Sequence, residues 1–298
     1  MDISYWFLIG FIIYGVVFLG GVVCFGLWSR RRRNERDPVE FKLLRAPGES
    51  LRRRVLQMDE NLIFYLLGAG MLPLLIAGLL LTGLSKITPH LSASLGISLC
   101  IGVFLLSAVL SGRWLLSKIK ERRNYVLGYL GERTVGEALL PLLSLNYHVF
   151  HDVPAEAGGR RFNLDHVVVG PTGVFLIETK TRRKGRARPG FKDHEVGYDG
   201  QKLIWPWGED RHGLEQAEAE TRWLAEWLNK LTGVGLIVRP ILALPGWYVK
   251  STAVGSVNVV NAKGLPSAIK GRGMRVISDE QIDLIARQLD QRCRDVED

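Results

Sequence analysis

The sequence predicts an α/β protein in which three transmembrane helices are followed by a mixed-sheet domain with flanking helices. The first third of the chain contains three apolar stretches without a charged residue, each long enough to cross a bilayer as a helix. The rest of the chain alternates short runs of Val, Ile and Phe, bounded by Gly and Pro, with longer segments of helical periodicity. Strands that alternate with helices predict a sheet covered by helices on both sides.

The predicted membrane anchor occupies residues 1–120, with transmembrane helices at about 3–28, 62–84 and 88–112 and a basic loop at 29–60. The first stretch is not expected to be a cleaved signal peptide, because it lacks a basic n-region and its apolar run is too long. The spans contain no Asp, Glu, Lys or Arg, which are the usual marks of an ion or proton path. An anchor is therefore expected rather than a transporter.

The distribution of basic residues predicts an orientation. Arg30–Arg33 follow the first span and a second basic group at 113–123 follows the third, whereas the loop between the second and third spans holds only Lys86. By the positive-inside rule the N-terminus is outside and the basic segments are cytoplasmic. We therefore expect a multi-pass protein of a bacterial-type inner (cell) membrane, with the lipid bilayer as one partner and the α/β domain in the cytoplasm.

The composition limits the partners further. The chain of 298 residues has a formal net charge of +9 at pH 7, which suits nucleic acid or an anionic membrane surface. Its three cysteines, Cys24, Cys100 and Cys293, lie far apart and lack the spacing of a disulfide framework or a metal site. Isolated reduced thiols are expected.

Residues 113–123 are expected to continue the third span as a basic helical stalk. Gly128 and Gly131 should then loosen the chain, and Thr134–Leu143 carries the apolar stripe of a separate short helix. Glu137 falls off this stripe, so its spacing alone describes a solvated residue in the first helical turn.

A hairpin at 163–180 is the centre of the predicted domain. Two apolar runs flank Gly170-Pro171-Thr172-Gly173, a break that is typical of a turn between strands. With Pro171-Thr172 as a two-residue turn, Asp165 falls opposite Glu178. The alternative, a type I turn with a bulge, slips the register by one residue and separates the two carboxylates.

The charged residues at the end of this hairpin suggest a cation site. Glu178 and Lys180 are two residues apart and therefore share one face of the strand. Carboxylates directly opposite each other repel by about 3 kcal/mol at an effective dielectric constant near 20, unless a cation lies between them. Mg²⁺ suits such a position, because it is held by carboxylates, water and substrate phosphates. Lys180 would add a positive charge beside a phosphate or an attacking water.

These residues resemble a known family. Asp165, a spacer and Glu178-Thr179-Lys180 resemble the motif of the PD-(D/E)xK nucleases. The wider pattern resembles the nuclease-related domain, NERD, through Val135-Gly136-Glu137, the runs Leu164–Val169 and Gly173–Lys180, and a later helix that carries Gln216. The resemblance covers roughly 131–244 and does not extend to the first third of the chain.

The resemblance implies a fold, an activity and residue roles. The fold would be a restriction-endonuclease-like domain at 121–298, with its motif core at 131–244 and a C-terminal extension at 245–298. The activity would be metal-dependent hydrolysis of phosphodiester bonds, with Mg²⁺ or Mn²⁺ as cofactor and nucleic acid, in the first place DNA, as substrate. Glu137, Asp165 and Glu178 would hold the metal, and Asp165, Glu178, Lys180 and Gln216 would form the catalytic set.

A run of basic residues directly follows Lys180. Its members are Arg182, Arg183, Lys184, Arg186 and Arg188. Such a run is usually a solvated loop, but beside a phosphodiester site it could neutralise backbone phosphates without sequence specificity. We therefore treat these residues as candidates for nucleic-acid binding.

The other elements follow from the same rules. Strands are expected at 147–153, 235–244 and 256–260, a further hairpin at 198–207, and helices at 213–231 and 279–293. Gln216 and Glu220 are four residues apart on a helix and therefore share a face. Trp205 and Trp207 could stack on bases, although such residues more often pack within the protein.

Two other interpretations of the domain remain open. It could be a binding module that tethers nucleic acid or a protein partner at the membrane without cutting, which predicts salt-sensitive binding without a metal requirement. The chain could also be a structural membrane protein with an accidental acidic hairpin, which requires Asp165 and Glu178 to point apart. The intact set of Asp, Glu and Lys favours the enzyme.

Overall fold

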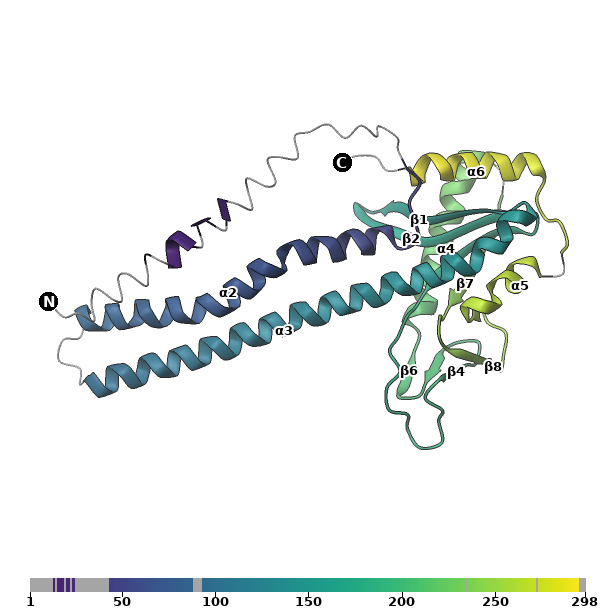
Figure 1. Cartoon of the computed structure of the whole chain (residues 1–298). Helices are drawn as coiled ribbons and strands as arrows, with labels where there is room; N and C mark the ends of the chain where they lie inside the picture. The colour runs from purple at the N-terminus through teal and green to yellow at the C-terminus, as the bar shows by residue number, and fades with distance from the viewer. Residues whose placement is uncertain are drawn as a thin grey trace. The chain divides into compact units, whose positions relative to one another are not determined.

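The computed structural model describes residues 43–87, 93–233, 235–271 and 273–294, together with part of 13–24. The chain divides into two compact units (Figure 1). The first comprises Met1–Phe41 and Leu56–Arg123, and the second comprises Lys42–Val55 and Asn124–Asp298.

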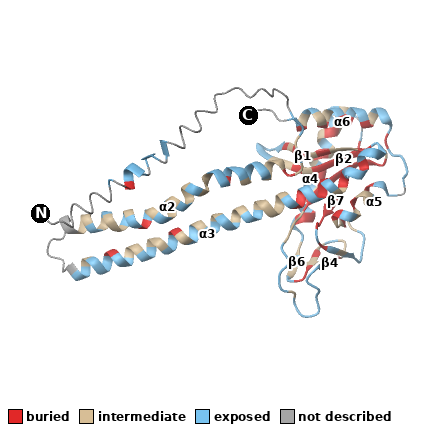
Figure 2. Ribbon diagram, in the orientation of Figure 1, coloured by how far each residue is buried: buried red, intermediate tan, exposed pale blue. Residues whose placement is uncertain are grey.

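Two long helices, α2 (Glu49–Ile87) and α3 (Ala93–Leu139), contain the apolar stretches of the first unit. Among the described residues, these are the two helices long and apolar enough to cross a membrane, within Glu49–Leu84 and Ser94–Leu145. Only 6% and 17% of the residues in their apolar windows are buried, far fewer than in the core helix of a soluble domain. Figure 2 shows the exposed and half-buried surface along both helices. They are candidate membrane-spanning helices.

The spans predicted at 62–84 and 88–112 fall on α2 and largely on α3. The span predicted at 3–28 lies mostly outside the described residues, although those described between 13 and 24 are helical. The structure therefore provides two candidate spans where the sequence predicts three.

The glycines of α3 have a different role from the one expected. Gly128 and Gly131 do not loosen the chain, because α3 is continuous from Ala93 to Leu139. Both lie where the helix approaches other segments closely. A Cβ atom at Gly131 would lie 1.7 Å from Thr181 Oγ1, and one at Gly128 would lie 2.9 Å from Leu51 Cδ1. The expectation of a break was wrong because these glycines serve close packing.

A five-stranded sheet forms the centre of the second unit, with strand order β1-β2-β3-β7-β9. Its strands are β1 (His148–Ala157), β2 (Arg160–Gly170), β3 (Gly173–Thr179), β7 (Val238–Ala243) and β9 (Asn258–Val260). The pairs β1–β2 and β2–β3 are antiparallel, whereas the pairs β3–β7 and β7–β9 are parallel. The sheet is mixed, as the sequence predicts.

Helices cover both faces of this sheet (Figure 1). On one face, α4 (His212–Thr232) and α6 (Asp279–Cys293) bury their apolar sides against β1–β3. On the other face, the end of α3, the 3-10 helix η2 (Leu140–Leu145) and α5 (Leu265–Lys270) form a second core. The two cores make the central strands apolar on both sides, which explains their continuous runs of Val, Ile and Leu.

A smaller four-stranded sheet, with strand order β6-β5-β4-β8, forms the lower lobe in Figure 1. Its strands are β4 (Glu195–Tyr198), β5 (Leu203–Trp205), β6 (Gly208–Asp210) and β8 (Tyr248–Ser251). The short 3-10 helix η3 (Ala262–Gly264) follows β9. Trp205 and Trp247 lie buried in the core under this sheet.

The predicted hairpin register is confirmed. Val169 pairs with Val174 and Gly170 with Gly173, so Pro171-Thr172 is a two-residue turn. The alternative turn with a bulge is therefore wrong. The ladder continues to His166 and Ile177, which places Asp165 and Glu178 at the next step of the same register.

The ladder between β1 and β2 is interrupted beside the candidate site. His151 pairs with His166 and Val153 with Leu164, so Asp152 and Asp165 stand opposite each other but do not pair. Asp152 has a left-handed backbone, with φ of 48°. Because of this local distortion, Asp165 does not take part in the regular pairing between β1 and β2.

The side chain of Asp152 links Arg45 and the start of α2 to the sheet. Its carboxylate accepts hydrogen bonds from the Ser50 N–H at 3.0 Å, the Ser50 hydroxyl at 2.6 Å and the Asn163 amide at 3.0 Å. Arg45 Nη1 forms an ion pair with Asp152 Oδ2 at 3.2 Å. A single buried acid thus joins three segments of the second unit.

Replacing Asp152 with Ala should destabilise the second unit by about 2–4 kcal/mol, because buried donors lose their acceptor and Ala is strained at positive φ. Asp152→Asn should cost less, since Asn keeps one acceptor oxygen and tolerates the left-handed conformation. Thermal unfolding of the purified full chain, followed by circular dichroism, checks the order. Equal melting temperatures for both variants would contradict the role of the backbone conformation.

Candidate active site

Four acidic side chains from four elements converge at the interrupted ladder. They are Glu132 on α3, Asp165 on β2, Glu178 on β3 and Glu220 on α4. Burial, followed by the charges of Glu178, Glu132 and Glu220, raises the pKa of Asp165, so all four acids lie within electrostatic reach of one another. The backbone N–H of Thr179 donates to Asp165 Oδ2 at 2.7 Å and holds this carboxylate beside the end of β3.

A chain of polar contacts connects β3 to α4. Lys180 Nζ lies 2.8 Å from Glu178 Oε1 and donates to Gln216 Oε1, also at 2.8 Å. Gln216 Nε2 in turn donates to Glu220 Oε1 at 2.8 Å. The sequence places Glu178 and Lys180 on one strand face and Gln216 and Glu220 on one helix face, and the structure brings these two faces together.

Gly213 allows Lys180 to pack closely against α4. A Cβ atom at Gly213 would lie 3.1 Å from Lys180 Cγ and 3.3 Å from Leu242 Cδ2. The first turn of α4 therefore packs directly on the aliphatic part of Lys180. This contact directs the ammonium group toward Glu178 and Gln216.

Burial raises the pKa of Glu132, Asp165 and Glu220. Glu132, Glu178 and Glu220 are at most 7% exposed. Burial, followed by the charges of Asp152 and Glu178, raises the pKa of Glu132 to about 8. Burial and the charge of Glu178 raise the pKa of Glu220 to about 9. Burial opposes the charge of Lys180, but Glu178 outweighs it and the Lys180 pKa is raised.

The donor atoms fit a hard divalent cation. Glu178 Oε2 and Glu220 Oε2 are buried and lack a hydrogen-bond partner, and the surrounding donors are carboxylate oxygens. Such oxygens are the ligands that Mg²⁺ and Mn²⁺ prefer. Within the described residues, however, no group of three or more His, Cys, Asp or Glu side chains is placed so that it could hold a metal ion. In this arrangement the ammonium group of Lys180 supplies the positive charge.

The structure does not bring Glu137 to this cluster. Its side chain is 63% exposed and forms an ion pair with Arg133 at 3.1 Å. Glu132, which the sequence analysis did not select, occupies the buried position instead. A signal for it exists in the sequence, because Glu132 lies three and seven residues before the buried Val135 and Leu139. An acid on the apolar stripe of a helix marks a functional candidate.

The basic run partly packs against the small sheet. Arg182 forms an ion pair with Asp210 at 2.6 Å and lies over the ring of Trp205, with 5.0 Å from Cζ to the ring centroid. Arg188 donates to the backbone carbonyls of Pro206 and Trp205 at 3.3 and 3.4 Å. These two arginines hold the loop on the lobe.

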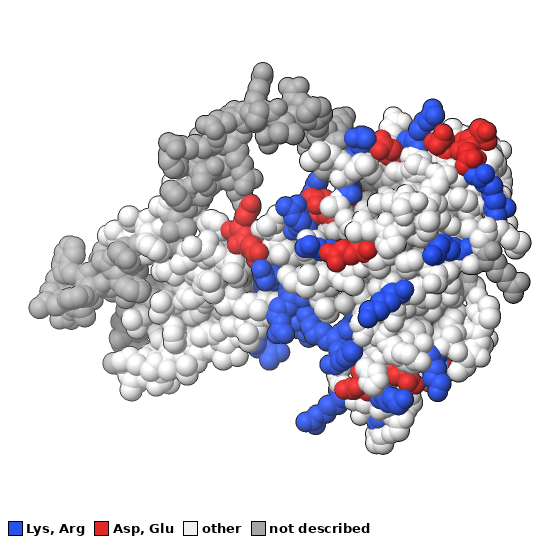
Figure 3. Space-filling model, turned by 45° about the vertical axis from the view of Figure 1, so that its right-hand side comes forward, with Lys and Arg blue, Asp and Glu red and all other residues white. Residues whose placement is uncertain are grey.

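The other members of the run are exposed. Arg183 donates to Asn124 Oδ1 at 2.7 Å, Lys184 lies 5.7 Å from the ring centroid of Trp247, and Arg186 extends from the loop surface. Figure 3 shows Lys and Arg side chains around the small lobe at the bottom of the view. This surface has the positive charge that a polyanion would need.

The fold and site together define a mixed-sheet domain with a buried centre of acids and one lysine. Residues 127–245 match the profile of the nuclease-related domain, NERD. The match covers less than half of the 298 residues, and it includes every acid of the cluster as well as Lys180 and Gln216. It suggests a nuclease-like function for the second unit.

Comparison with curated proteins finds no match. Among solved structures, the crystal structure of protein VC1899 from Vibrio cholerae matches with 14% sequence identity and a TM-score of 0.20. The alignment covers 83% of this chain and 58% of that chain, so this chain spans less than two thirds of its length. A TM-score this low carries no argument about fold or function.

Proposed function

We propose that this protein is a membrane-anchored, metal-dependent nuclease of the PD-(D/E)xK type that hydrolyses phosphodiester bonds in DNA. The observation that carries the proposal is the convergence of Glu132, Asp165 and Glu178 beside Lys180. The NERD match over 127–245 supports the same activity. Mg²⁺ or Mn²⁺ is the proposed cofactor.

The proposed anchor consists of α2, α3 and a first span at 3–28. The N-terminus lies outside a bacterial-type inner membrane and the nuclease-like domain lies in the cytoplasm, as the positive-inside rule requires. The low burial of the apolar windows of α2 and α3 supports the anchor. The lipid bilayer is then the partner that fixes the enzyme in place.

The chain's own residues have distinct roles in this proposal. Glu132, Asp165 and Glu178 would hold the cation, with Glu132 in the role that the resemblance implied for Glu137. Once bound, the cation would lower the pKa of a water molecule and stabilise negative charge on the phosphate. Lys180 would donate to that water or to a phosphate oxygen and balance the developing charge.

Gln216 would orient the reacting groups. Its amide contacts both Lys180 and Glu220, so it fixes the direction of the ammonium group. During hydrolysis the water oxygen bonds to phosphorus, one bridging P–O bond breaks, and the leaving oxygen takes up a proton. The basic residues Arg183, Lys184 and Arg186 would contact the phosphate backbone without reading the sequence.

The test is cleavage of plasmid and linear DNA by the full chain in detergent micelles, with Mg²⁺, with Mn²⁺ and with EDTA. Lys180→Met should reduce cleavage at least about 100-fold, because a charge that stabilises the transition state is lost. The matched control is Lys192→Met, which removes an exposed lysine that pairs with Glu195 on the small lobe. It should cleave like the wild type.

Equal cleavage by Lys180→Met and the wild type would remove Lys180 from the mechanism. Absence of cleavage with both metals would overturn the enzyme and favour the second candidate, a non-catalytic module that binds nucleic acid or protein. One observation favours that candidate. Lys180 already pairs with Glu178, so this acid of the cluster is neutralised without an added cation.

A further inference from the structure

Trp207 occupies an unusual position at the tip of a tight turn. Trp205 pairs with Gly208, so Pro206-Trp207 is the two-residue turn between β5 and β6. Trp207 is 36% exposed, whereas Trp205 and Trp247 beneath it are almost fully buried. A large aromatic side chain is thus presented to solvent where a small turn residue would suffice.

The aromatic neighbours hold Trp207 in a fixed orientation. Its ring stacks on Trp205, with ring centroids 5.7 Å apart and planes at 12°. Trp247 meets both rings edge-on, at 5.0 Å from Trp205 and 5.5 Å from Trp207. One face of Trp207 is therefore covered by protein, and its orientation needs no further ordering when a ligand stacks on it.

Two basic side chains contact this stack. The guanidinium of Arg182 lies over Trp205, and the ammonium of Lys184 lies near Trp247. Gly185 of the same basic loop lies beside Trp207, because a Cβ atom there would be 3.8 Å from Trp207 Cε3. Gly185 thus brings the basic loop against Trp207, with Lys184 and Arg186 next to the glycine in the sequence.

The stack adjoins the candidate active site through the chain. Arg182 is two residues after Lys180, which corresponds to about 7 Å of extended backbone. Its carbonyl accepts a hydrogen bond from Trp247 Nε1 at 3.3 Å. On the other side, β6 leads directly into α4, whose Gly213 packs on Lys180. A polyanion that extends from Lys180 along the basic loop would reach Trp207.

We infer that Trp207 is the base-stacking residue of a surface for single-stranded nucleic acid, on which Lys184 and Arg186 contact the phosphates. This inference rests on the proposed nuclease function and narrows its substrate. Every base has an aromatic face, but in an intact duplex that face is covered by its neighbours. The preferred substrate is therefore a single strand, or a duplex with unpaired nucleotides, rather than an intact duplex.

The test measures binding apart from cleavage. The full chain in detergent micelles carries Glu178→Gln and is kept in EDTA, and fluorescence anisotropy follows labelled oligothymidylate and a blunt duplex of equal length. Trp207→Leu should weaken binding of the single strand about tenfold or more, since stacking of one base contributes about 1–3 kcal/mol. Trp207→Phe should retain most of the binding. The affinity for the duplex should change little in either variant.

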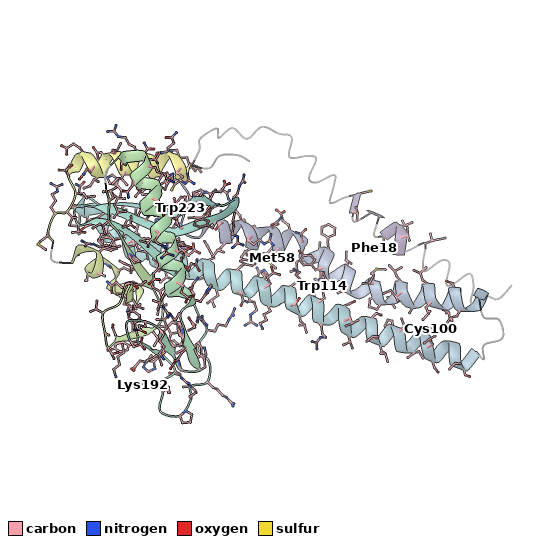
Figure 4. The ribbon with its side chains drawn as sticks, turned by 180° about the vertical axis from the view of Figure 1, so that it is seen from behind. Phe18, Met58, Cys100, Trp114, Lys192 and Trp223 are labelled. Carbon is pink, nitrogen blue, oxygen red and sulfur yellow. The ribbon has the colours of Figure 1, made fainter. Side chains whose placement is uncertain are left out.

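The chain offers a matched control. Trp223 also stacks on a second tryptophan, Trp227, at 5.9 Å, and Arg292 lies over both rings. Figure 4 shows Trp223 on α4 below α6, at the opposite end of the domain from Lys192 in the small lobe. Trp223→Leu should bind the single strand like the parent protein, and thermal unfolding confirms that each variant is folded.

Three results would overturn the inference. Trp207→Leu and Trp207→Phe could bind the single strand equally well, or Trp207→Leu could lose as much affinity for the duplex as for the single strand. Trp223→Leu could also lose as much affinity for the single strand as Trp207→Leu. These outcomes do not depend on hydrolysis, because the background protein is inactivated and no metal is present. If the variants bind as expected but the wild-type protein never cleaves DNA, the single-strand surface stands and the proposed nuclease activity is wrong.

Discussion

Replacing Glu132 with Gln is expected to abolish metal-dependent DNA cleavage, whereas Glu137→Gln should cleave like the wild type. Glu132 is buried and interacts electrostatically with Asp152, Glu178 and Lys180. Glu137 is exposed and contacts Arg133 on the same helix. Changes to groups that merely orient metal ligands typically reduce activity 10–100-fold, so loss of a ligand should cost more than about 100-fold. The two glutamates lie on different faces of α3 and therefore differ in burial and in their neighbours.

Initial cleavage rates of plasmid DNA, measured over a series of Mn²⁺ concentrations, distinguish the two positions. Glu132→Gln should require a higher metal concentration for any residual activity, because one ligand is missing. Both variants should melt at or above the wild-type temperature in EDTA, since neither loses a buried apolar contact. If Glu137→Gln were the inactive variant, the site described above would be wrong.

Mn²⁺ or Mg²⁺ should raise the melting temperature of the protein, and the rise should be larger at pH 9 than at pH 6. In the absence of a cation, Glu132 and Glu220 hold protons in the folded state up to about pH 8 and about pH 9. The unfolded chain releases the same protons near pH 4.5, the ordinary pKa of Glu. The folded state therefore binds more protons between these limits, and stability must fall as the pH rises through this window.

A bound cation reverses this penalty because it stabilises the charged carboxylates. At a cation concentration one hundred times its Kd, mass action contributes about 2.7 kcal/mol, which corresponds to roughly 5–10 °C for a domain of this size. Differential scanning calorimetry of the second unit's transition, with EDTA or with Mn²⁺ at several pH values, measures the effect. Glu137→Gln should respond like the wild type, and identical melting curves with and without cation at pH 9 would contradict a cation site.

The sequence predicts the centre of the site well because local rules determine it. The two-residue turn at Pro171-Thr172 fixes the register, and the alternation of strand side chains then places Glu178 and Lys180 together. Helical periodicity in the same way places Gln216 and Glu220 on one face. Each of these predictions needs only residues that are close in the chain.

Other features depend on contacts that are distant in sequence. The parallel pairing of β4 with β8 joins Glu195 to Tyr248. No local sequence pattern predicts this pairing. The left-handed Asp152 is stabilised by Ser50 and Asn163, so its conformation follows from tertiary contacts. The burial of Glu132 and the exposure of Glu137 have a related origin, because both depend on α3 being continuous up to Leu139.

The close approach of α3 to Thr181 makes the site vulnerable to a single added methyl group. Gly131 is the residue before Glu132, and any side chain there would overlap Thr181 Oγ1. The helix would have to withdraw from the end of β3, and it would carry the neighbouring carboxylate with it. The position of the Glu132 carboxylate thus depends on the absence of a side chain at Gly131. Gly131→Ala would displace this carboxylate from the candidate site without altering the charge of the site.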